Sequence, residues 1–448
     1  MVRGVVSWLR AGSSAGGKGS SATLAAATAS VGARWLVIEI EGLDFGGRGR
    51  AAENGASRQV KARHRSDALA VTMTHYRRIG HVEVTRMYAE IELHNFRGIR
   101  RLAVEQLGRV NLLVGPNNAG KTSFLEALWL LQAPGNPTLV NNAGGFRGLS
   151  TQLQGQNPAW YGLFLNMDRS ARIQIIGRLV DGRTEQLSIS LANEWAQGSL
   201  PTSNGAKTTP PVEETASPTL MVETLYYDFR KDDGPSVRSS VSVGLGQVGL
   251  QLHPELTSRQ AIFLAARFHS PPEEIATRFT TVQDTTGIAP LVKSLGVLQP
   301  GLENLSLGYR MEGGQAQIQL RAHLRGLDPP IPLQLLGEGV GRLMDILLGI
   351  SSAREGLLLI DEVENGLYYQ NMETAWRAID VASREAKVQV FATTHSAECV
   401  QAAVRTFEGK SAKDFRLYRL ERTGEGVRVV AYDHEAAASA VRFGLEFR

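Results

Sequence analysis

The chain has 448 residues, of which 43% are hydrophobic and 21% are charged, so a globular protein with core for two or three domains is expected. No apolar run approaches the ~20 residues of a membrane span, which favours a soluble, cytoplasmic protein without a membrane partner. The single cysteine, Cys399, excludes an intrachain disulfide and a cysteine-based zinc site. Its apolar surroundings predict a buried position in a helix.

Charge is distributed unevenly along the chain. The formal net charge of +4 arises from residues 1–86, which hold 13 Lys/Arg against 6 Asp/Glu. The remaining residues hold 35 Lys/Arg against 38 Asp/Glu. The main part of the chain therefore gives no global electrostatic reason to expect DNA binding, and DNA would need a local basic patch.

Residues 1–86 differ in composition from the rest of the chain, because Gly, Ser, Ala and Arg dominate them. Trp35–Ile38 is the one run that could form a strand. Residues 1–38 contain no Asp or Glu and are rich in Arg and Ser, which is a property of targeting peptides. Arg10 interrupts any signal-like apolar core, so we favour a disordered extension or a start assigned upstream of Met87.

From Met87 onward the pattern becomes regular. Residues Ile91–Phe96 alternate like a half-buried strand, and Leu102–Val104 can pair back after a turn at 97–99. The apolar run Val110–Val114 has the composition of a strand that is buried on both faces. A hairpin and a buried strand are therefore expected before residue 115.

A glycine-rich turn and a helix, residues 123–131, come directly after that strand. The turn fits the phosphate-binding pattern G-x-x-x-x-G-K-[ST] at every fixed position. Glycines permit a tight turn whose N–H groups face phosphates, Lys121 adds a positive charge, and the Thr122 hydroxyl can bind Mg²⁺. We therefore predict ATP and Mg²⁺ as ligands. The predicted nucleotide contacts are Gly115, Pro116, Asn117, Asn118, Ala119, Gly120, Lys121, Thr122 and Ser123.

The segment from about residue 150 to 330 is predicted to be an insertion rich in antiparallel strands. Asp181-Gly182 is a hairpin signal between two strand-like runs. Residues 199–218 are rich in Pro, Ser, Thr and Gly, which is typical of a surface loop. The other expected elements are strands at 173–176, 187–190, 220–227 and 241–252 and a helical segment at 271–296.

Two further apolar strands end in polar residues. Leu357–Ile360 leads into Asp361, a predicted Mg²⁺ ligand, and Glu362, which would polarise the attacking water. Val388–Thr393 leads to His395, which would sense the terminal phosphate. Because ligands of parallel sheets bind at the carboxyl ends of the strands, we expect these groups to meet the glycine-rich turn at one edge.

Small residues also open a helical run at 343–350, which indicates either another anion site or an ordinary helix cap.

Taken together, the motifs resemble the ABC-class ATPase heads of the family that includes RecF recombination proteins, structural-maintenance-of-chromosomes heads and overcoming-lysogenization-defect nucleases. Short stand-alone AAA-family ATPases, without a coiled-coil arm or a fused nuclease, are the most similar. The motifs that carry the resemblance are Asn95–Ile99, Gly115–Thr122, Leu336–Gly339, Ile360–Leu367 and Thr393–Ser396.

The resemblance covers residues 87–448 and implies an α/β fold of the P-loop NTPase class. Its mixed sheet would carry flanking helices and an added antiparallel β subdomain. It also implies a homodimer, in which Gly337, Glu338 and Gly339 form a signature motif that reaches the partner's γ-phosphate. Residues 364–367 would lie at the dimer seam. Glu338 departs from the small polar residues of transporter ATPases, and an acidic group is unfavourable beside a phosphate unless it points away.

The resemblance alone assigns Arg97 and a Mg²⁺-binding glutamine to the site, and it supports the role already inferred for His395. Arg97 corresponds to a position near the nucleotide in related heads, and His395 corresponds to the switch histidine. A glutamine that binds Mg²⁺ is also implied, for which Gln152, Gln154 and Gln156 are equal candidates.

The leading functional hypothesis is an ATP hydrolase that works as a nucleotide-gated dimer in DNA maintenance or in defence against foreign DNA. A separate nuclease or other effector would act with it. One alternative is a scaffold that ATP closes with little turnover. A transporter subunit is disfavoured by the ~240 residues between the glycine-rich turn and Asp361. A fused nuclease is disfavoured because 53 residues follow His395, fewer than a domain of ~100 residues needs.

Overall fold

The computed structural model describes residues 29–30, 35–36, 86–140, 158–197, 219–244, 247–254, 256, 259–266, 270–312, 315–424 and 426–444. The chain divides into two compact units, Met1–Ile79 and Gly80–Arg448. In the first unit β1 (Ala29–Ser30) pairs antiparallel with β2 (Trp35–Leu36), and β2 falls within the predicted strand. The predicted loop at 199–218 lies outside the described residues. The second unit contains all the predicted site residues.

One face of this second unit is a seven-stranded antiparallel sheet with the order β10-β9-β8-β7-β6-β3-β4. The predicted hairpin between β3 and β4 is confirmed, with Leu93 opposite Leu102. The predicted turn between β6 and β7 is also confirmed, and Gly182 adopts a φ of 88° there. The strands are β3 (Tyr88–Phe96), β4 (Ile99–Val104), β6 (Ile173–Leu179), β7 (Thr184–Gln197), β8 (Thr219–Lys231), β9 (Val237–Gly244) and β10 (Gln247–Gln251).

The second sheet has the order β11-β15-β16-β5-β17-β18, in which all pairs are parallel except β17 with β18. Every residue of β5, β15 and β16 is buried, as apolar runs covered on both faces require. β11 lies within the predicted insertion and yet belongs to this sheet. The strands are β5 (Val110–Val114), β11 (Ala261–Leu264), β15 (Leu357–Ile360), β16 (Gln389–Thr393), β17 (Phe415–Thr423) and β18 (Gly426–Tyr432).

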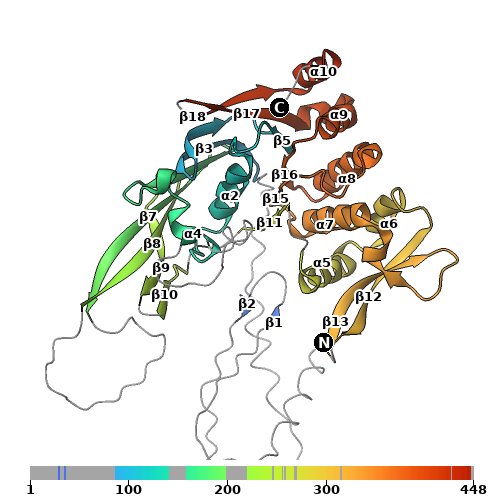
Figure 1. The fold of residues 1–448 in the computed structure, drawn as a ribbon, viewed down its shortest axis with the longest axis horizontal. Coiled ribbons are helices and arrows are strands. Elements are labelled where there is room, and N and C mark those ends of the chain that lie inside the picture. Colours follow the sequence, from blue (N-terminus) through green and yellow to red (C-terminus); the bar gives the residue numbers. More distant parts are fainter. Residues whose placement is uncertain are drawn as a thin grey trace, which may run out of the picture. The chain divides into compact units, whose positions relative to one another are not determined.

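Helix α2 (Lys121–Gln132) lies between the two sheets (Figure 1). Its Phe124 packs in one core with Leu93 of the antiparallel sheet and Phe391 of the parallel sheet. A second core fills the opposite face of the parallel sheet, where α7, α8, α9 and α10 follow one another (Figure 1). These helices are α7 (Glu338–Ser352), α8 (Met372–Glu385), α9 (Ala397–Thr406) and α10 (His434–Arg442). Cys399 is buried in α9, as predicted.

Two sequence predictions need correction. The helical segment at 271–296 consists of two helices, because Gly287 adopts a left-handed φ of 73° that ends the first one. The strand predicted at 241–252 is a hairpin in which Val243 of β9 pairs with Val248 of β10. The remaining elements are α4 (Pro158–Tyr161), α5 (Pro272–Thr285), α6 (Ala289–Gly296), β12 (Leu302–Glu312), β13 (Gln315–Leu324), β14 (Ile331–Pro332) and the 3-10 turns Leu165–Met167, Leu333–Leu336, Tyr369–Asn371 and Gly409–Asp414.

The architecture is that of a P-loop NTPase, with α2 starting at Lys121, within the glycine-rich turn that follows β5. Within the described ranges, no helix combines the length and the apolar character that crossing a bilayer demands.

Candidate functional site

The glycine-rich turn, hereafter the phosphate loop (residues 115–122), comes directly after β5. Gly115 and Gly120 adopt φ values of 133° and 99°. A Cβ atom at Gly115 would lie 2.3 Å from the carbonyl oxygen of Leu420, so the position requires glycine. No side chain caps the N-terminus of α2 and no acidic residue occupies its first turn. A helix N-terminus of this kind, directly after a glycine-rich turn, suits the binding of an anion.

Lys121 lies over the loop that precedes it. Its Nζ donates hydrogen bonds to the carbonyl oxygens of Gly115 at 2.7 Å and Pro116 at 3.0 Å. Burial lowers the pKa of the lysine to about 8, although the carboxylates of Asp361 and Glu362 oppose this shift. A phosphate in the loop would supply the negative charge that keeps this amine protonated.

Asp361 and Thr122 meet at the end of β15, as predicted. The Thr122 hydroxyl donates to Asp361 Oδ1 at 3.0 Å, and the Thr393 hydroxyl donates to the same oxygen at 2.7 Å. Burial raises the pKa of Asp361, while these two hydrogen bonds lower it. A buried carboxylate beside a hydroxyl is an oxygen donor set that fits Mg²⁺, which completes its shell with water and substrate phosphates. Among the described residues, no cluster of three or more His, Cys, Asp or Glu could hold a metal without such help.

Glu362 is held in an unusual backbone conformation with a φ of 49°. Its N–H donates to the Thr393 hydroxyl at 2.8 Å, so one threonine fixes both neighbouring acidic residues. Asn365 donates to Glu362 Oε2 at 2.8 Å and to the carbonyl of Ala266 at 3.1 Å. The side chain of Glu362 is 37% exposed, so water can reach the carboxylate that the amide orients.

His395 connects the end of β16 to the same site. Its Nδ1 lies 3.4 Å from Lys121 Nζ, and its Nε2 lies 3.7 Å from Glu362 Oε1. The N–H of His395 donates to Glu364 Oε1 at 2.8 Å. The phosphate loop, Asp361, Glu362 and His395 are thus brought together at one sheet edge, as the strand ends predicted.

Arg342 of α7 holds the backbone that follows β15. Its guanidinium, buried in α7, donates to the carbonyl oxygens of Asp361 at 2.9 Å and Glu362 at 3.3 Å. Burial lowers the pKa of this arginine, while the carboxylates of Asp345 and Asp361 raise it. The helix that begins at the signature motif is therefore tied to the strand that carries the acidic pair.

The signature motif lies beside the loop after Glu362. Gly337, with a φ of 96°, precedes the first turn of α7. A Cβ atom at Gly366 would lie 2.8 Å from Cγ of the exposed Glu338, and one at Gly339 would lie 2.9 Å from the Gly366 carbonyl oxygen. The two segments are thus in contact within one chain, and their contact with a partner's nucleotide stays a prediction.

Arg97 reaches α2. Its Nε lies 2.6 Å from Oε2 of the fully buried Glu126, five residues beyond Lys121, and its guanidinium lies over the Phe96 ring at 5.6 Å. A role of Arg97 in nucleotide binding stays a prediction. Gln152, Gln154 and Gln156 lie outside the described residues.

The sequence analysis did not predict the contacts that four residues make at or near the site. Two of these side chains orient the carboxylates of the acidic pair, one donates to the backbone carbonyls of that pair, and one forms an ion pair with Arg97. None of these contacts follows from the spacing of residues in the sequence. These residues are Thr393, Asn365, Arg342 and Glu126.

Residues 110–400 match the family model described as "AAA domain, putative AbiEii toxin, Type IV TA system". The chain is 21% identical over 364 residues to a protein of Helicobacter pylori (strain ATCC 700392 / 26695) named "ATP/GTP phosphatase". The aligned region covers 76% of this chain and 94% of that protein.

Solved structures were compared as well. The chain is similar to an Smc head bound to the C-winged helix domain of ScpA, with 12% identity, a TM-score of 0.41 and coverage of 79% of this chain and 99% of that one. It is also similar to the SMC head domain from Thermotoga maritima, with 14% identity, a TM-score of 0.36 and coverage of 77% and 99%.

Proposed function

Because the chain belongs to the AAA-domain family whose model it matches, we propose that its ATPase site works as a nucleotide-gated switch in a homodimer. The protein is an ATPase of the P-loop class. The observation that carries the proposal is the meeting of Lys121, the Thr122–Asp361 pair, Glu362 and His395 at one sheet edge. These are the groups that phosphoryl transfer to water needs.

Each side chain has one role in the proposed reaction. Lys121 and the N–H groups of the loop bind the phosphates of ATP. Thr122 and Asp361 would hold Mg²⁺, which neutralises phosphate charge when it is bound. Glu362 accepts a hydrogen bond from the attacking water and orients it, while Asn365 keeps the carboxylate turned toward the site. His395 lies between Lys121 and Glu362, where it can contact the terminal phosphate.

Dimerisation is supported by an exposed surface, which we name the seam. It consists of Leu335–Gly339 and Gly366–Tyr369. Within it Leu335, Tyr368 and Tyr369 are 70%, 56% and 55% exposed. Exposed hydrophobic groups that flank a motif typically mark an interaction site. A second copy placed against the seam would bring Gly337–Gly339 to its phosphates and cover these side chains.

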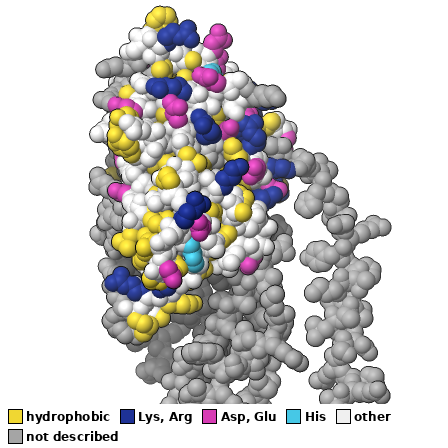
Figure 2. Space-filling model, turned by 90° about the vertical axis from the view of Figure 1, so that its right-hand side faces the viewer, with side chains coloured by type: hydrophobic (Ala, Val, Ile, Leu, Met, Phe, Trp, Pro, Cys, Tyr) yellow, Lys and Arg dark blue, Asp and Glu magenta, His cyan; other side chains and the backbone are white. Residues whose placement is uncertain are grey.

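For the biological role we propose DNA maintenance or defence against foreign DNA, in which a separate effector protein, such as a nuclease, acts downstream. On the face drawn in Figure 2, Lys/Arg and Asp/Glu side chains are interspersed with hydrophobic ones. Such a surface suits contact with protein better than the one-sign patch that nucleic acid favours. The family description names a putative toxin of a toxin–antitoxin system, which supports defence as the class of role.

Steady-state ATP hydrolysis of the wild type and of Glu362→Gln tests this proposal. We expect the wild type to hydrolyse ATP with Mg²⁺ present, and Glu362→Gln to bind ATP and hydrolyse it about 10²–10⁴ times more slowly. Glu373→Gln, a surface substitution on α8, is the matched control and should hydrolyse ATP at the wild-type rate. Measurable and equal rates for wild type and Glu362→Gln would contradict the role given to Glu362, whereas negligible turnover by the wild type itself would leave an ATP-switched scaffold as the better description.

A further inference from the structure

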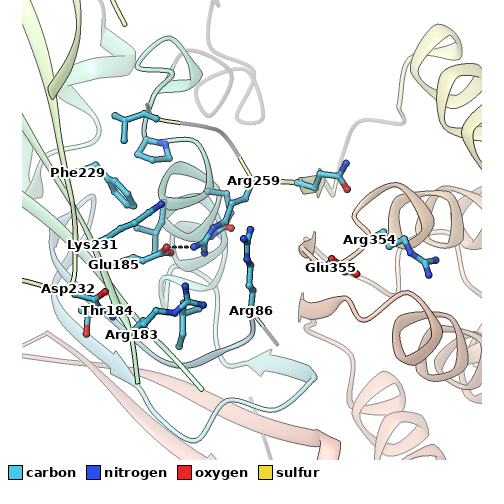
Figure 3. Close-up of a pocket in the computed structure, with 16 residues that line it drawn as sticks. Arg86, Arg183, Thr184, Glu185, Phe229, Lys231, Asp232, Arg259, Arg354 and Glu355 are labelled. Carbon is cyan, nitrogen blue, oxygen red and sulfur yellow. Dashed lines mark hydrogen bonds and ion pairs between the residues drawn. The ribbon is translucent and has the colours of Figure 1, made fainter. Parts of the chain in front are cut away.

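A cavity of about 360 Å³ lies at the end of the parallel sheet where β11 and β15 begin, opposite the ATP site. Figure 3 shows the side chains that line it. Gln260 and Glu355, which line it, precede the first residues of β11 and β15. Asp361, in contrast, comes after the last residue of β15. The strands therefore run from the cavity toward the ATP site, and the two sites do not share residues.

One wall of the cavity is a fixed polar network. Glu185 is buried, accepts a hydrogen bond from the Tyr88 hydroxyl at 2.9 Å and pairs with Arg259. Gln132, at the end of α2, donates to the same hydroxyl at 2.8 Å and accepts from the N–H of Arg259 at 2.7 Å. The one buried carboxylate of this wall is thus neutralised before any ligand arrives, and apolar groups such as Phe229 complete the lining.

The lining carries an excess of positive charge. Five cationic side chains and three carboxylates line the cavity. One of the cations, Arg183, also pairs at 2.6 Å with Asp181, which lies outside the lining. Within the described residues, Arg86 and Lys231 have no carboxylate partner, and the Lys231 amine lies 5.9 Å from the centroid of the Phe229 ring. In Figure 3 the ends of Arg86, Lys231 and Arg259 lie around the same space. A concave site with low-dielectric walls concentrates the field of such groups, so it attracts an anion.

We propose that this cavity binds a small phosphate-bearing anion, separately from the ATP site. Its volume is within the range of small-molecule sites, ~300–1,000 Å³, and is too small for a macromolecule. Guanidinium groups contact several oxygens of one phosphate at once, which favours phosphate over a single carboxylate. The apolar part of the lining, including Phe229, accepts the remainder of the ligand.

Titration calorimetry with inorganic pyrophosphate tests the proposal. It is performed without metal on the full chain carrying Lys121→Ala, so that the ATP site contributes little and the result does not depend on the proposed ATPase mechanism. We expect a Kd below about 1 mM, raised at least tenfold by Arg86→Gln or by Lys231→Gln. Both side chains are exposed, so these variants should fold. Arg310→Gln, an exposed arginine on β12, is the matched control and should leave the Kd unchanged.

Three results would overturn the proposal. The first is the absence of binding below about 1 mM. The second is a Kd that neither cavity substitution changes, because the pyrophosphate would then bind elsewhere. The third is equal affinity for acetate, which would show that the cavity prefers carboxylates or does not discriminate.

Discussion

Two regions of the molecule differ in how their polar groups are held. The first is the end of the parallel sheet that carries the ATP site, and the second is the seam. At the edge, one threonine hydroxyl joins Asp361 and Glu362, and Asn365 and Arg342 support the same residues from other elements. The seam exposes Leu335, Tyr368 and Tyr369, and its glycines lie against Glu338 and Gly366, which belong to the seam itself. The comparison teaches that one chain brings together the groups proposed for phosphate binding and water activation, whereas under the proposed function the signature motif acquires its role only beside a second copy.

The largest expected effect is at Glu362. Glu362→Gln should slow hydrolysis by about 10²–10⁴, which is the contribution of a positioned general base, and leave ATP affinity nearly unchanged. Single-turnover hydrolysis and calorimetry measure the two quantities. Hydrolysis at the wild-type rate would move the role to another carboxylate, with Glu364 the next candidate because its Oε1 accepts from the N–H of His395.

Lys121→Ala should act on binding and hydrolysis together, because the amine contacts phosphate before the reaction starts. Loss of charge-assisted hydrogen bonds costs ~1.5–3 kcal/mol, so ATP affinity should fall about 10- to 100-fold. Lys293→Ala, an exposed lysine on α6, is the control. Unchanged affinity for Lys121→Ala would show that the loop binds phosphates through its backbone alone.

A smaller effect is expected at Asn365, which orients Glu362 without touching the substrate. Asn365→Ala removes one hydrogen bond to a carboxylate, worth ~1.5 kcal/mol, and should lower kcat about tenfold with KM unchanged. Asn304→Ala, on β12, should change neither constant. A rise of KM at constant kcat would show that Asn365 serves binding and not the orientation of the carboxylate.

His395→Ala should have the same kind of effect as Glu362→Gln, but a smaller one, if His395 only senses the terminal phosphate.

An effect similar in size to that at Asn365, but on association and not on catalysis, is expected at the seam, where one aromatic side chain is removed. Tyr369→Ala should weaken the ATP-bound dimer about tenfold and leave the ATP affinity of the monomer unchanged, since Tyr369 is 55% exposed in the single chain. Sedimentation of this variant across a range of concentrations, compared with Tyr309→Ala on β12, gives the dimer constant. Equal dimer constants for the two variants would place the interface elsewhere.

The sequence predicted those parts of the site that local patterns determine. The strands β5, β15 and β16 are apolar runs that each end in a polar motif, and the first of these motifs is the phosphate loop. All three strands were found as predicted. β11 was missed because four apolar residues, Ala261–Leu264, do not distinguish a strand from other buried segments. The helix break at Gly287 was missed because a single glycine is tolerated inside many helices.

Residues that act through tertiary contacts could not be predicted in the same way. Thr393 bonds to Asp361 and Glu362 across 32 and 31 positions of sequence, and Arg342 reaches the same backbone from α7. Neither contact has a spacing rule, because each depends on how β15, β16 and α7 pack. The cavity at the opposite end of the sheet was even less predictable from the sequence, since Arg86, Lys231 and Arg259 belong to different segments.

The central claim is that ATP closes two copies of this chain across the seam. Light scattering on Glu362→Gln measures it most directly, because that variant should hold ATP without hydrolysing it. With ATP and Mg²⁺ the mass should double from that of the 448-residue monomer, and it should return to the monomer when ADP replaces ATP. A monomer that has bound ATP and keeps its mass would contradict the account.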